Sequence, residues 1–136
     1  GGAAQIKAMK KIAAPIRTEL AQYRELASFA QFGSELDDDT KEKLAQGERI
    51  KEVLKQSQYS PMPVELQVIM IYVVTKKHLL DVPVDRVTEF EKNFIEFLKT
   101  NYPEIPNSIK DTKEISDETD EKLVKAINEF KDSFLK

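Results

Sequence analysis

An apolar segment in the middle of the sequence constrains the fold more than any other feature. Seven consecutive residues, Val68 to Val74, are apolar, and valine and leucine flank them within the stretch 60–80. Seven residues make about 10 Å of helix, whereas a membrane span needs roughly 20 apolar residues, so we expect no membrane insertion. The many β-branched residues also suit a buried strand over 64–74. We favour a buried helix over about 63–80, because a helix that is apolar nearly all round belongs at the centre of a bundle.

The residues at both ends of this segment support a helix. Pro61 and Pro63 can precede or begin its first turn, where the missing N–H is not needed. Lys76, Lys77 and His78 fall in its expected last turn, where positive charge suits the carbonyl end of the helix dipole.

Length and composition limit the class of protein. The chain has 136 residues, which is enough for one domain, and it has no cysteine, which excludes disulfides, thiolate zinc sites and a cysteine nucleophile. With 21 basic and 24 acidic residues its formal charge is −3, and no basic stripe stands out, so we expect no nucleic-acid partner. Only four glycines are present, which leaves little room for a phosphate-binding loop. We therefore expect a soluble, globular, helical protein.

Apolar residues recur at helical spacing before the central segment. We expect a first helix over about 3–32, which Pro15 bends or divides near Ala14 because proline lacks an N–H and crowds the preceding turn. A second helix should follow over about 40–55. Gly47 inside it costs about 1 kcal/mol against alanine, and we hypothesise that it lets a neighbouring helix come close.

The second half of the sequence keeps this pattern. We expect a fourth helix that ends near Thr100, and a last helix that Ser116 or Asp117 caps. The predicted fold class is therefore all-α, a single bundle of five to six helices around the buried central helix. The breaks expected between the helices are Phe32-Gly33, a polar turn over 56–62, residues 81–84, and a connection over 101–113 with one helical turn near Ile109.

The sequence holds none of the motifs that would identify an enzyme. The phosphate-binding pattern GxxxxGK followed by Ser or Thr, GxSxG and HExxH are all missing. The single histidine, His78, suits a solvated or capping side chain at a helix end better than a catalytic group. Asp37, Asp38 and Asp39 are adjacent, whereas calcium loops alternate their ligands, so we expect partners of a helix dipole and no metal site. We predict no catalytic residue in this chain and no enzymatic activity of the chain alone.

Several segments of the sequence resemble one known family. They are similar to the C-terminal helical domain of the α subunit of F-type ATP synthase, and the similarity covers essentially the whole chain. It implies one C-terminal domain over 1–136, in which 1–15 is a linker helix arm from a nucleotide-binding domain. The matching strings, in order and without large gaps, are GGAAQIKAMKK at 1–11, ELAQYREL at 19–26, FAQFGSELD at 29–37, EVLKQSQYSPMPVELQV at 52–68, FEK at 90–92 and, more loosely, KLVKAINEFKDSFL at 122–135.

The resemblance implies a structural and coupling role in a rotary motor. In that family the non-catalytic, regulatory α subunit alternates with β subunits around the γ rotor, and the complex couples proton or sodium flow to ATP synthesis from ADP and phosphate. The expected partners are therefore the β and γ subunits, with the ε subunit as a further candidate. The expected location is the cytoplasmic face of the cell membrane, as a peripheral part of the complex, or the equivalent organelle membrane.

Catalytic parts are expected elsewhere in such a subunit. The resemblance implies that the arginine finger and the P-loop lie upstream of Gly1, so we expect no cofactor in this chain and Mg-ATP in the full subunit. Gln56 and Gln58, which match the family's KQxQ turn, would contact the adenine of the non-catalytic nucleotide. A plain polar turn before a proline-started helix is the alternative. Two hydrogen bonds worth about 1 kcal/mol each cannot hold a nucleotide, so we expect no detectable ATP binding to this chain alone.

The acidic connector 34–40 is the second candidate site. The resemblance implies that it faces the rotor, where its side chains would meet basic residues through salt-sensitive attraction. A solvated turn that only caps a helix is the alternative. The candidate rotor-facing residues are Glu35, Leu36, Asp37, Asp38 and Asp39.

Two other functions have to be weighed against this one. A free-standing all-α protein–protein interaction module without enzymatic activity would share the helical pattern, although the long matching strings argue against it. A small helical enzyme would need a convergent polar cluster, which the sequence does not offer. Pro15 departs from the family, which has a small or hydroxyl residue there, so we expect a different bend in the first helix. The resemblance also implies that the arm 1–14 packs on the nucleotide-binding domain, so in the isolated chain we expect this arm to fray or to make a non-native contact.

Overall fold

The computed structural model describes residues 7–30, 37–59 and 62–135, with side chains described from Ala14 onward in the first range and up to Gln56 in the second. These residues form six α-helices, one 3-10 helix and no strand, so the prediction of an all-α bundle is confirmed and the strand alternative for 64–74 is wrong. None of the described helices is both long and apolar enough to span a membrane. The elements are α1 (Lys7–Ala30), α2 (Asp38–Tyr59), α3 (Val64–Thr75), η2 (Val84–Arg86), α4 (Val87–Asn101), α5 (Glu104–Thr112) and α6 (Asp117–Phe134).

The apolar segment forms the buried centre, as predicted. Every side chain from Val68 to Val74 is at most 7% exposed, so α3 has no solvated face along this run. Helices α1, α2 and α5 pack against it. Burying one such side chain stabilises the fold by about 1.5–3 kcal/mol, so this short helix carries a large share of the hydrophobic stabilisation.

The central helix is shorter than the predicted span of about 63–80, because it ends at Thr75. Lys77 has a φ of 66°, and its N–H donates to the Val74 carbonyl at 3.1 Å, while the N–H of His78 donates to the Val73 carbonyl at 3.1 Å. These two bonds around a left-handed residue are the Schellman motif that closes many helices. Glycine usually marks that position, and lysine occupies it here, so the sequence carried no stop signal. The basic residues that we expected in the last turn therefore lie beyond the helix.

Helix α2 is longer than predicted and includes the residues expected to form a polar turn. It continues past Lys55 to Tyr59, so Gln56 and Gln58 lie in its last turn. Glutamine, serine and tyrosine are tolerated in a helix, and polarity alone does not end one. The prolines that follow in the sequence are the stronger stop signal, because a residue before proline disfavours the helical region.

Helix α1 passes through Pro15 without ending. It is one continuous helix from Lys7 to Ala30, so the alternative of two helices meeting near Ala14 is wrong. Pro15 is exposed, which places its ring on the solvent side of α1. The predicted helix end at Phe32-Gly33 lies outside the described residues.

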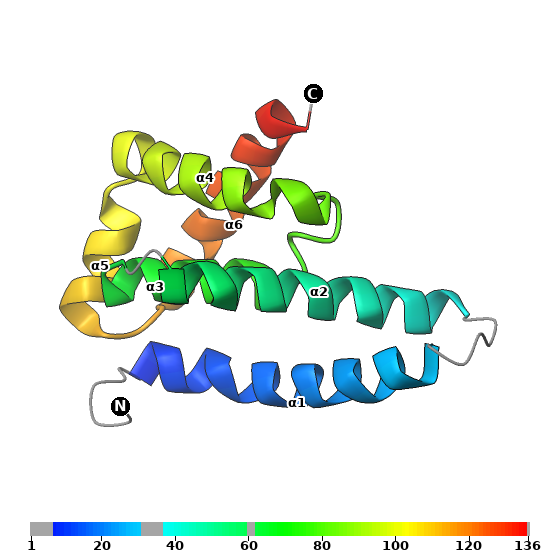
Figure 1. Ribbon diagram of the computed structural model, residues 1–136. Coiled ribbons are helices and arrows are strands. Elements are labelled where there is room, and N and C mark those ends of the chain that lie inside the picture. Colours follow the sequence, from blue (N-terminus) through cyan, green and yellow to red (C-terminus); the bar gives the residue numbers. More distant parts are fainter. Residues whose placement is uncertain (1–6, 31–36, 60–61, 136) are drawn as a thin grey trace.

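Helices α1 and α2 lie side by side and antiparallel, and α4 lies on the other side of α2 (Figure 1). Gly47 of α2 is buried against Tyr23 of α1, and a Cβ atom added to Gly47 would lie 2.3 Å from Cδ1 and 2.7 Å from Cβ of Tyr23. Real contacts are not this short, so the two helices approach this closely because Gly47 has no Cβ atom. The hypothesis that Gly47 admits a neighbouring helix is confirmed.

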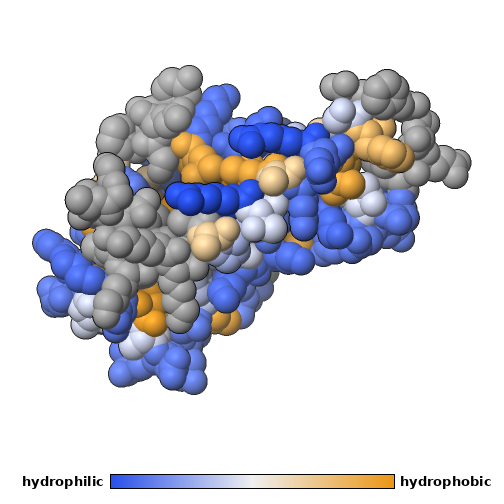
Figure 2. Space-filling model, turned by 90° about the horizontal axis from the view of Figure 1, so that it is seen from below, coloured by the Kyte–Doolittle hydropathy of each residue, from blue (hydrophilic) through white to orange (hydrophobic). Residues whose placement is uncertain are grey.

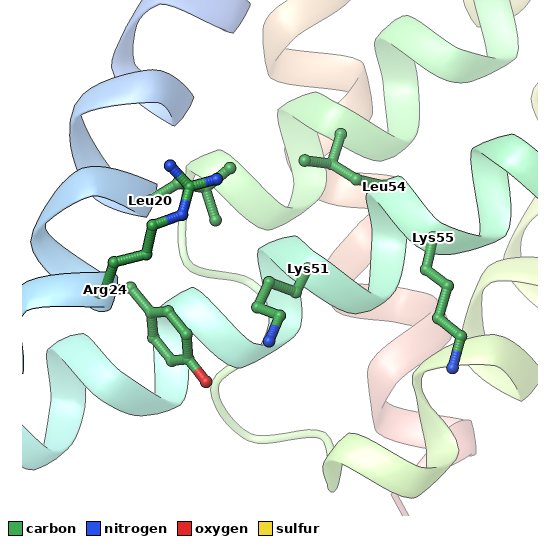
Figure 3. A pocket seen from close by; sticks show the side chains of 6 residues that line it. Leu20, Arg24, Lys51, Leu54 and Lys55 are labelled. Carbon is green, nitrogen blue, oxygen red and sulfur yellow. The ribbon is translucent and has the colours of Figure 1, made fainter. Parts of the chain in front are cut away.

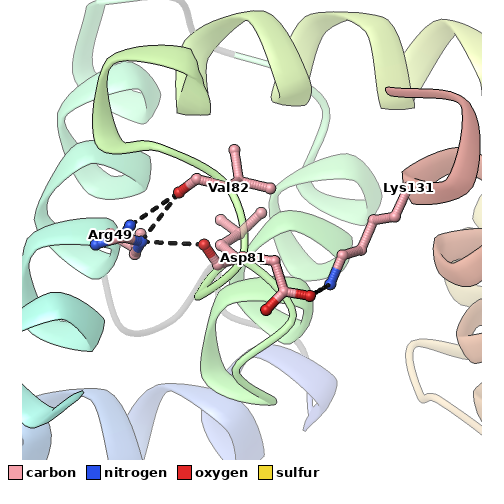
Figure 4. Close-up of polar contacts among 5 residues, drawn as sticks. Arg49, Asp81, Val82 and Lys131 are labelled. Atoms are coloured by element: carbon pink, nitrogen blue, oxygen red, sulfur yellow. Dashed lines mark hydrogen bonds and ion pairs between the residues drawn. The ribbon is translucent and has the colours of Figure 1, made fainter. Parts of the chain in front are cut away.

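Arg49 fixes the turn after α3 to α2 (Figure 4). Its Nε donates to the carbonyl of Leu79 at 3.0 Å, and its Nη2 donates to the carbonyl of Val82 at 2.9 Å. From the other side, Nζ of Lys131 on α6 pairs with Oδ2 of Asp81 at 3.0 Å. The turn after α3 is therefore bound to α2 on one side and to α6 on the other.

The C-terminal helices complete the core. The Ser116 hydroxyl accepts the N–H of Thr119 at 3.1 Å, which confirms Ser116 as the N-cap of α6. The ring of Phe90 on α4 packs edge-on against Phe130 and Phe134 of α6, with centroids 5.1 and 5.3 Å away. Helix α5, predicted as a single turn near Ile109, runs over Glu104–Thr112.

Candidate functional site

The acidic residues at the start of α2 are exposed, and they stabilise this end of the helix. Oδ1 of Asp37 accepts the N–H of Thr40 at 2.8 Å, so Asp37 is the N-cap of α2. Hydrogen bonds from the side chain and the backbone N–H of Thr40 lower the pKa of Asp37. Asp38 and Asp39 follow in the first turn, where negative charge suits the helix dipole.

These aspartates are available to a partner. Asp37, Asp38 and Asp39 are all exposed, and Asp39 pairs with Lys43 one turn later, with Nζ and Oδ2 3.1 Å apart. Glu35 and Leu36, the other two predicted rotor-facing residues, lie outside the described residues. The described part of the sequence holds no group of three or more His, Asp or Glu side chains that could bind a metal ion. The arrangement can thus stabilise α2 and attract a cationic surface.

The other end of α2 opens into a groove toward α4. Gln56 is half-buried there, and its Nε2 donates to Oε1 of Glu52 at 3.5 Å, a long contact. Gln58 lies in the same last turn, and its side chain is outside the described part of the molecule. Positions two apart in a helix do not share a face, so the two glutamines diverge along α2 as long as this turn stays helical. The groove has a volume of about 380 Å³ and is lined by Gln56, Met62, Thr88, Glu91, Lys92, Ile95 and Glu96.

Glu91 in this groove is a residue that sequence reasoning missed. It is only 5% exposed, and its Oε2 has no hydrogen-bond partner in the part of the molecule that the structure describes. Burial, with a smaller contribution from the nearby carboxylate of Glu52, raises the pKa of Glu91 to about 7. A signal was present, because Glu91 stands four residues after Val87 and three before Phe94, both on the buried face of α4.

His78 lies beyond the end of the central helix. It is half-buried after the end of α3, with its ring stacked 6.4 Å from that of Tyr72. Burial, with the nearby charge of Lys131, lowers the pKa of His78. The prediction of a capping role holds for its backbone N–H, which closes α3, whereas the predicted solvated side chain in a last turn is wrong.

A second cleft lies between α1 and α2, close to the contact between Gly47 and Tyr23. Its volume is about 290 Å³, and Figure 3 shows its side chains coming from both helices. Nζ of Lys51 lies 5.1 Å from the centre of the Tyr23 ring, within the range of a cation–π interaction. The lining residues are Leu20, Tyr23, Arg24, Lys51, Leu54 and Lys55.

Comparisons with known proteins agree with the resemblance seen in the sequence. A family model described as "ATP synthase alpha/beta chain, C terminal domain" matches residues 5–130. ATP synthase subunit alpha of Acetivibrio thermocellus is 60% identical over 136 residues, which is 100% of this chain and 27% of that protein. The proteins of the same name from Syntrophomonas wolfei and Clostridium botulinum strain Hall are 54% and 52% identical, over 98% and 99% of this chain and again 27% of their own length.

The chain therefore spans about a quarter of the length of the curated relatives that it matches. The family match covers most of its residues, and the all-helical fold is the one that the resemblance implied. This protein belongs to the family of C-terminal domains of ATP synthase alpha and beta subunits.

Proposed function

We propose that this chain is the C-terminal structural and coupling domain of the non-catalytic, regulatory α subunit of a proton-translocating F-type ATP synthase. The observation that carries this proposal is the similarity to alpha subunits along the whole sequence, at 52–60% identity. In this role the domain packs in the α/β hexamer as a peripheral part of the complex at the cytoplasmic face of the membrane. The complex makes ATP from ADP and phosphate, and the chain alone has no activity.

The exposed aspartates at the start of α2 are the proposed contact with the central rotor. Their support is physical: Asp37, Asp38 and Asp39 form an anionic helix end on the surface, and only Asp39 has an ion-pair partner among the described residues. Such a charge cluster attracts a basic surface over about a Debye length, which is roughly 8 Å at physiological salt. This attraction would steer the rotor rather than bind it tightly.

Charge reversal in the assembled complex tests the rotor contact. The variant Asp38→Lys with Asp39→Lys leaves the Asp37 cap in place, and we expect it to change the torque or the rate of ATP hydrolysis, most strongly at low salt. The matched control reverses Asp117 and Glu118, which are exposed in the first turn of α6. If rotation and hydrolysis stay unchanged in the Asp38/Asp39 variant of a correctly assembled complex, the rotor contact is wrong.

We propose Gln56 as an adenine contact in the full subunit, where Mg-ATP is the expected ligand. Its support is that Gln56 lines a groove and that its amide makes only a long contact to Glu52, so the amide can turn to a base edge. Gln58 joins it in the proposal only if the last turn of α2 unwinds in the full subunit. Because one hydrogen bond contributes about 1 kcal/mol, Gln56→Ala should weaken nucleotide binding at the non-catalytic site by about fivefold. An unchanged affinity of the full subunit would contradict this contact.

A further inference from the structure

The cleft between α1 and α2 has a charge opposite to that of the molecule as a whole. The formal charge of the whole sequence is −3, yet Arg24, Lys51 and Lys55 line this cleft, and no acidic residue in the described part of the chain does. All three are exposed, and none of them forms an ion pair with another described residue. The structure thus gathers three cations around one opening, with no counter-ion at ion-pair distance among the described residues.

The acidic residues nearest to these cations in the sequence do not line the cleft. Glu25 on α1 and Glu48 and Glu52 on α2 are not among the lining residues. Glu52 lies toward α4 instead, where its Oε1 accepts from the hydroxyl of Thr88 at 3.5 Å. The charged residues of the described lining are therefore all basic.

The walls of the cleft are apolar. Leu20, Tyr23 and Leu54 are each half-buried, so part of each residue remains open to the surface. Seen from the side of α1, the molecule shows an apolar band between strongly hydrophilic side chains (Figure 2). An apolar patch that polar side chains surround is a feature of surfaces that bind a partner.

We propose that this cleft is a docking site for an acidic peptide segment of a partner protein, with one large apolar side chain that enters between Leu20 and Leu54. Carboxylates on either side of that apolar residue then pair with Arg24, Lys51 and Lys55. The proposal rests on charge complementarity, and it is independent of the rotor contact at the other end of α2. A simple anion site is disfavoured because every polar group of the lining except the Tyr23 hydroxyl belongs to an exposed flexible cation. A nucleic acid is disfavoured because it needs a longer basic stripe.

Peptide titration of the 136-residue protein tests this docking site. The probe is a short acetylated peptide of glutamates around one central leucine, followed by NMR of the isotope-labelled protein. We expect saturable shifts confined to residues near Leu20, Tyr23 and Leu54, and weaker binding as salt increases. Two control peptides should bind much more weakly: one with lysine in place of glutamate, and one with alanine in place of leucine.

Two charge-reversal variants separate this cleft from the general charge of the molecule. Lys51→Glu with Lys55→Glu should weaken binding by about tenfold, since each exposed pair contributes roughly 0.2–1 kcal/mol and reversal adds repulsion. The matched variant, Lys110→Glu with Lys125→Glu, changes exposed lysines of α5 and α6 and should leave the affinity within about twofold. Circular dichroism confirms that both variants remain helical.

Several results would overturn the proposal. These are the absence of saturable shifts, equal weakening by both charge-reversal pairs, and equal binding of the lysine peptide. Displacement of the peptide by inorganic phosphate at equal concentration would assign the cleft to simple anions instead. Shifts that depend on protein concentration without any peptide would assign it to a second copy of this protein.

Discussion

Ionisation of Glu91 should make the stability of this protein depend on pH. Its pKa in the folded protein is about 7, above the 4.5 of an unperturbed glutamate, because burial and Glu52 disfavour the carboxylate. The folded state therefore holds its proton more tightly than the unfolded state does. The resulting stabilisation is complete below about pH 4.5 and is lost as pH rises through 7, with a total change of about 3 kcal/mol.

Replacing this carboxyl group should remove that pH dependence. We expect Glu91→Gln to match the natural protein in free energy of unfolding near pH 4.5, and to exceed it by up to about 3 kcal/mol at pH 8. Urea unfolding across this range measures both quantities. Glu96→Gln, a change to an exposed glutamate on the same helix, serves as the control and should shift stability by less than about 0.5 kcal/mol. A difference between the natural protein and Glu91→Gln that does not vary with pH would contradict the raised pKa.

At the scale of elements, the packing of α1 on α2 depends on a glycine. Alanine at position 47 gains about 1 kcal/mol of helix propensity, but its Cβ would meet Tyr23 at 2.3 Å, and overpacking of this kind costs about 1–3 kcal/mol. Because even the Cβ of Tyr23 is only 2.7 Å away, rotation of the tyrosine ring does not relieve the contact and α1 must shift. We expect Gly47→Ala to destabilise the protein by about 1 kcal/mol in thermal or urea unfolding.

A double-mutant cycle shows whether Tyr23 is the cause. Tyr23→Gly removes Cβ, Cγ and Cδ1 of this side chain, the three atoms that a Cβ at position 47 would meet, so Gly47→Ala should cost clearly less in that background. Glu48→Ala, at the neighbouring exposed position, should be near neutral. An equal cost of Gly47→Ala with and without the Tyr23 side chain would locate the strain elsewhere.

The ends of the elements show what the sequence could and could not predict. Periodicity found the helices and the core, because burial of Val68–Val74 or of Phe90 needs only a repeat of apolar residues. It failed at the end of α3, where the left-handed residue is Lys77 and not glycine, since tertiary packing imposes that conformation. The spacing of Glu91 from Val87 and Phe94 matched the buried face of α4, but glutamate is rarely buried, so periodicity alone did not identify it.

The candidate sites likewise include one that the sequence predicted and one that it did not. The helix-dipole role of Asp37, Asp38 and Asp39 followed from local chemistry, because negative charge at the start of a helix is favourable wherever the helix packs. The basic cleft could not be predicted, because Arg24 on α1 and Lys51 on α2 are far apart in sequence and meet only when Gly47 brings their helices together. Contacts within one helical turn can therefore be predicted from the sequence, whereas contacts between side chains of different elements cannot.

At the scale of the whole molecule, stability is unevenly distributed. Among the described side chains of α1 (14–30), only Ile16 is buried, whereas α3 buries eight of its residues. Figure 1 shows α1 at the outside of the bundle, and its main contacts are with α2 and α3. Opening α1 thus exposes less apolar surface than opening the core, so α1 can detach while the remaining helices stay folded.

Hydrogen exchange tests whether α1 opens while the core stays folded. We expect the amides of α1 to exchange through a local opening, and those of α3 only through global unfolding, so that α1 is protected less. Ile16→Ala should then speed exchange in α1 with little effect on α3, because the lost contact stabilises only the closed form of α1. Ile69→Ala, at the centre of the core, should speed exchange in both helices. Equal acceleration of α1 and α3 by Ile16→Ala would mean that the molecule unfolds as one unit, and that α1 is as much a part of the core as the helix it covers.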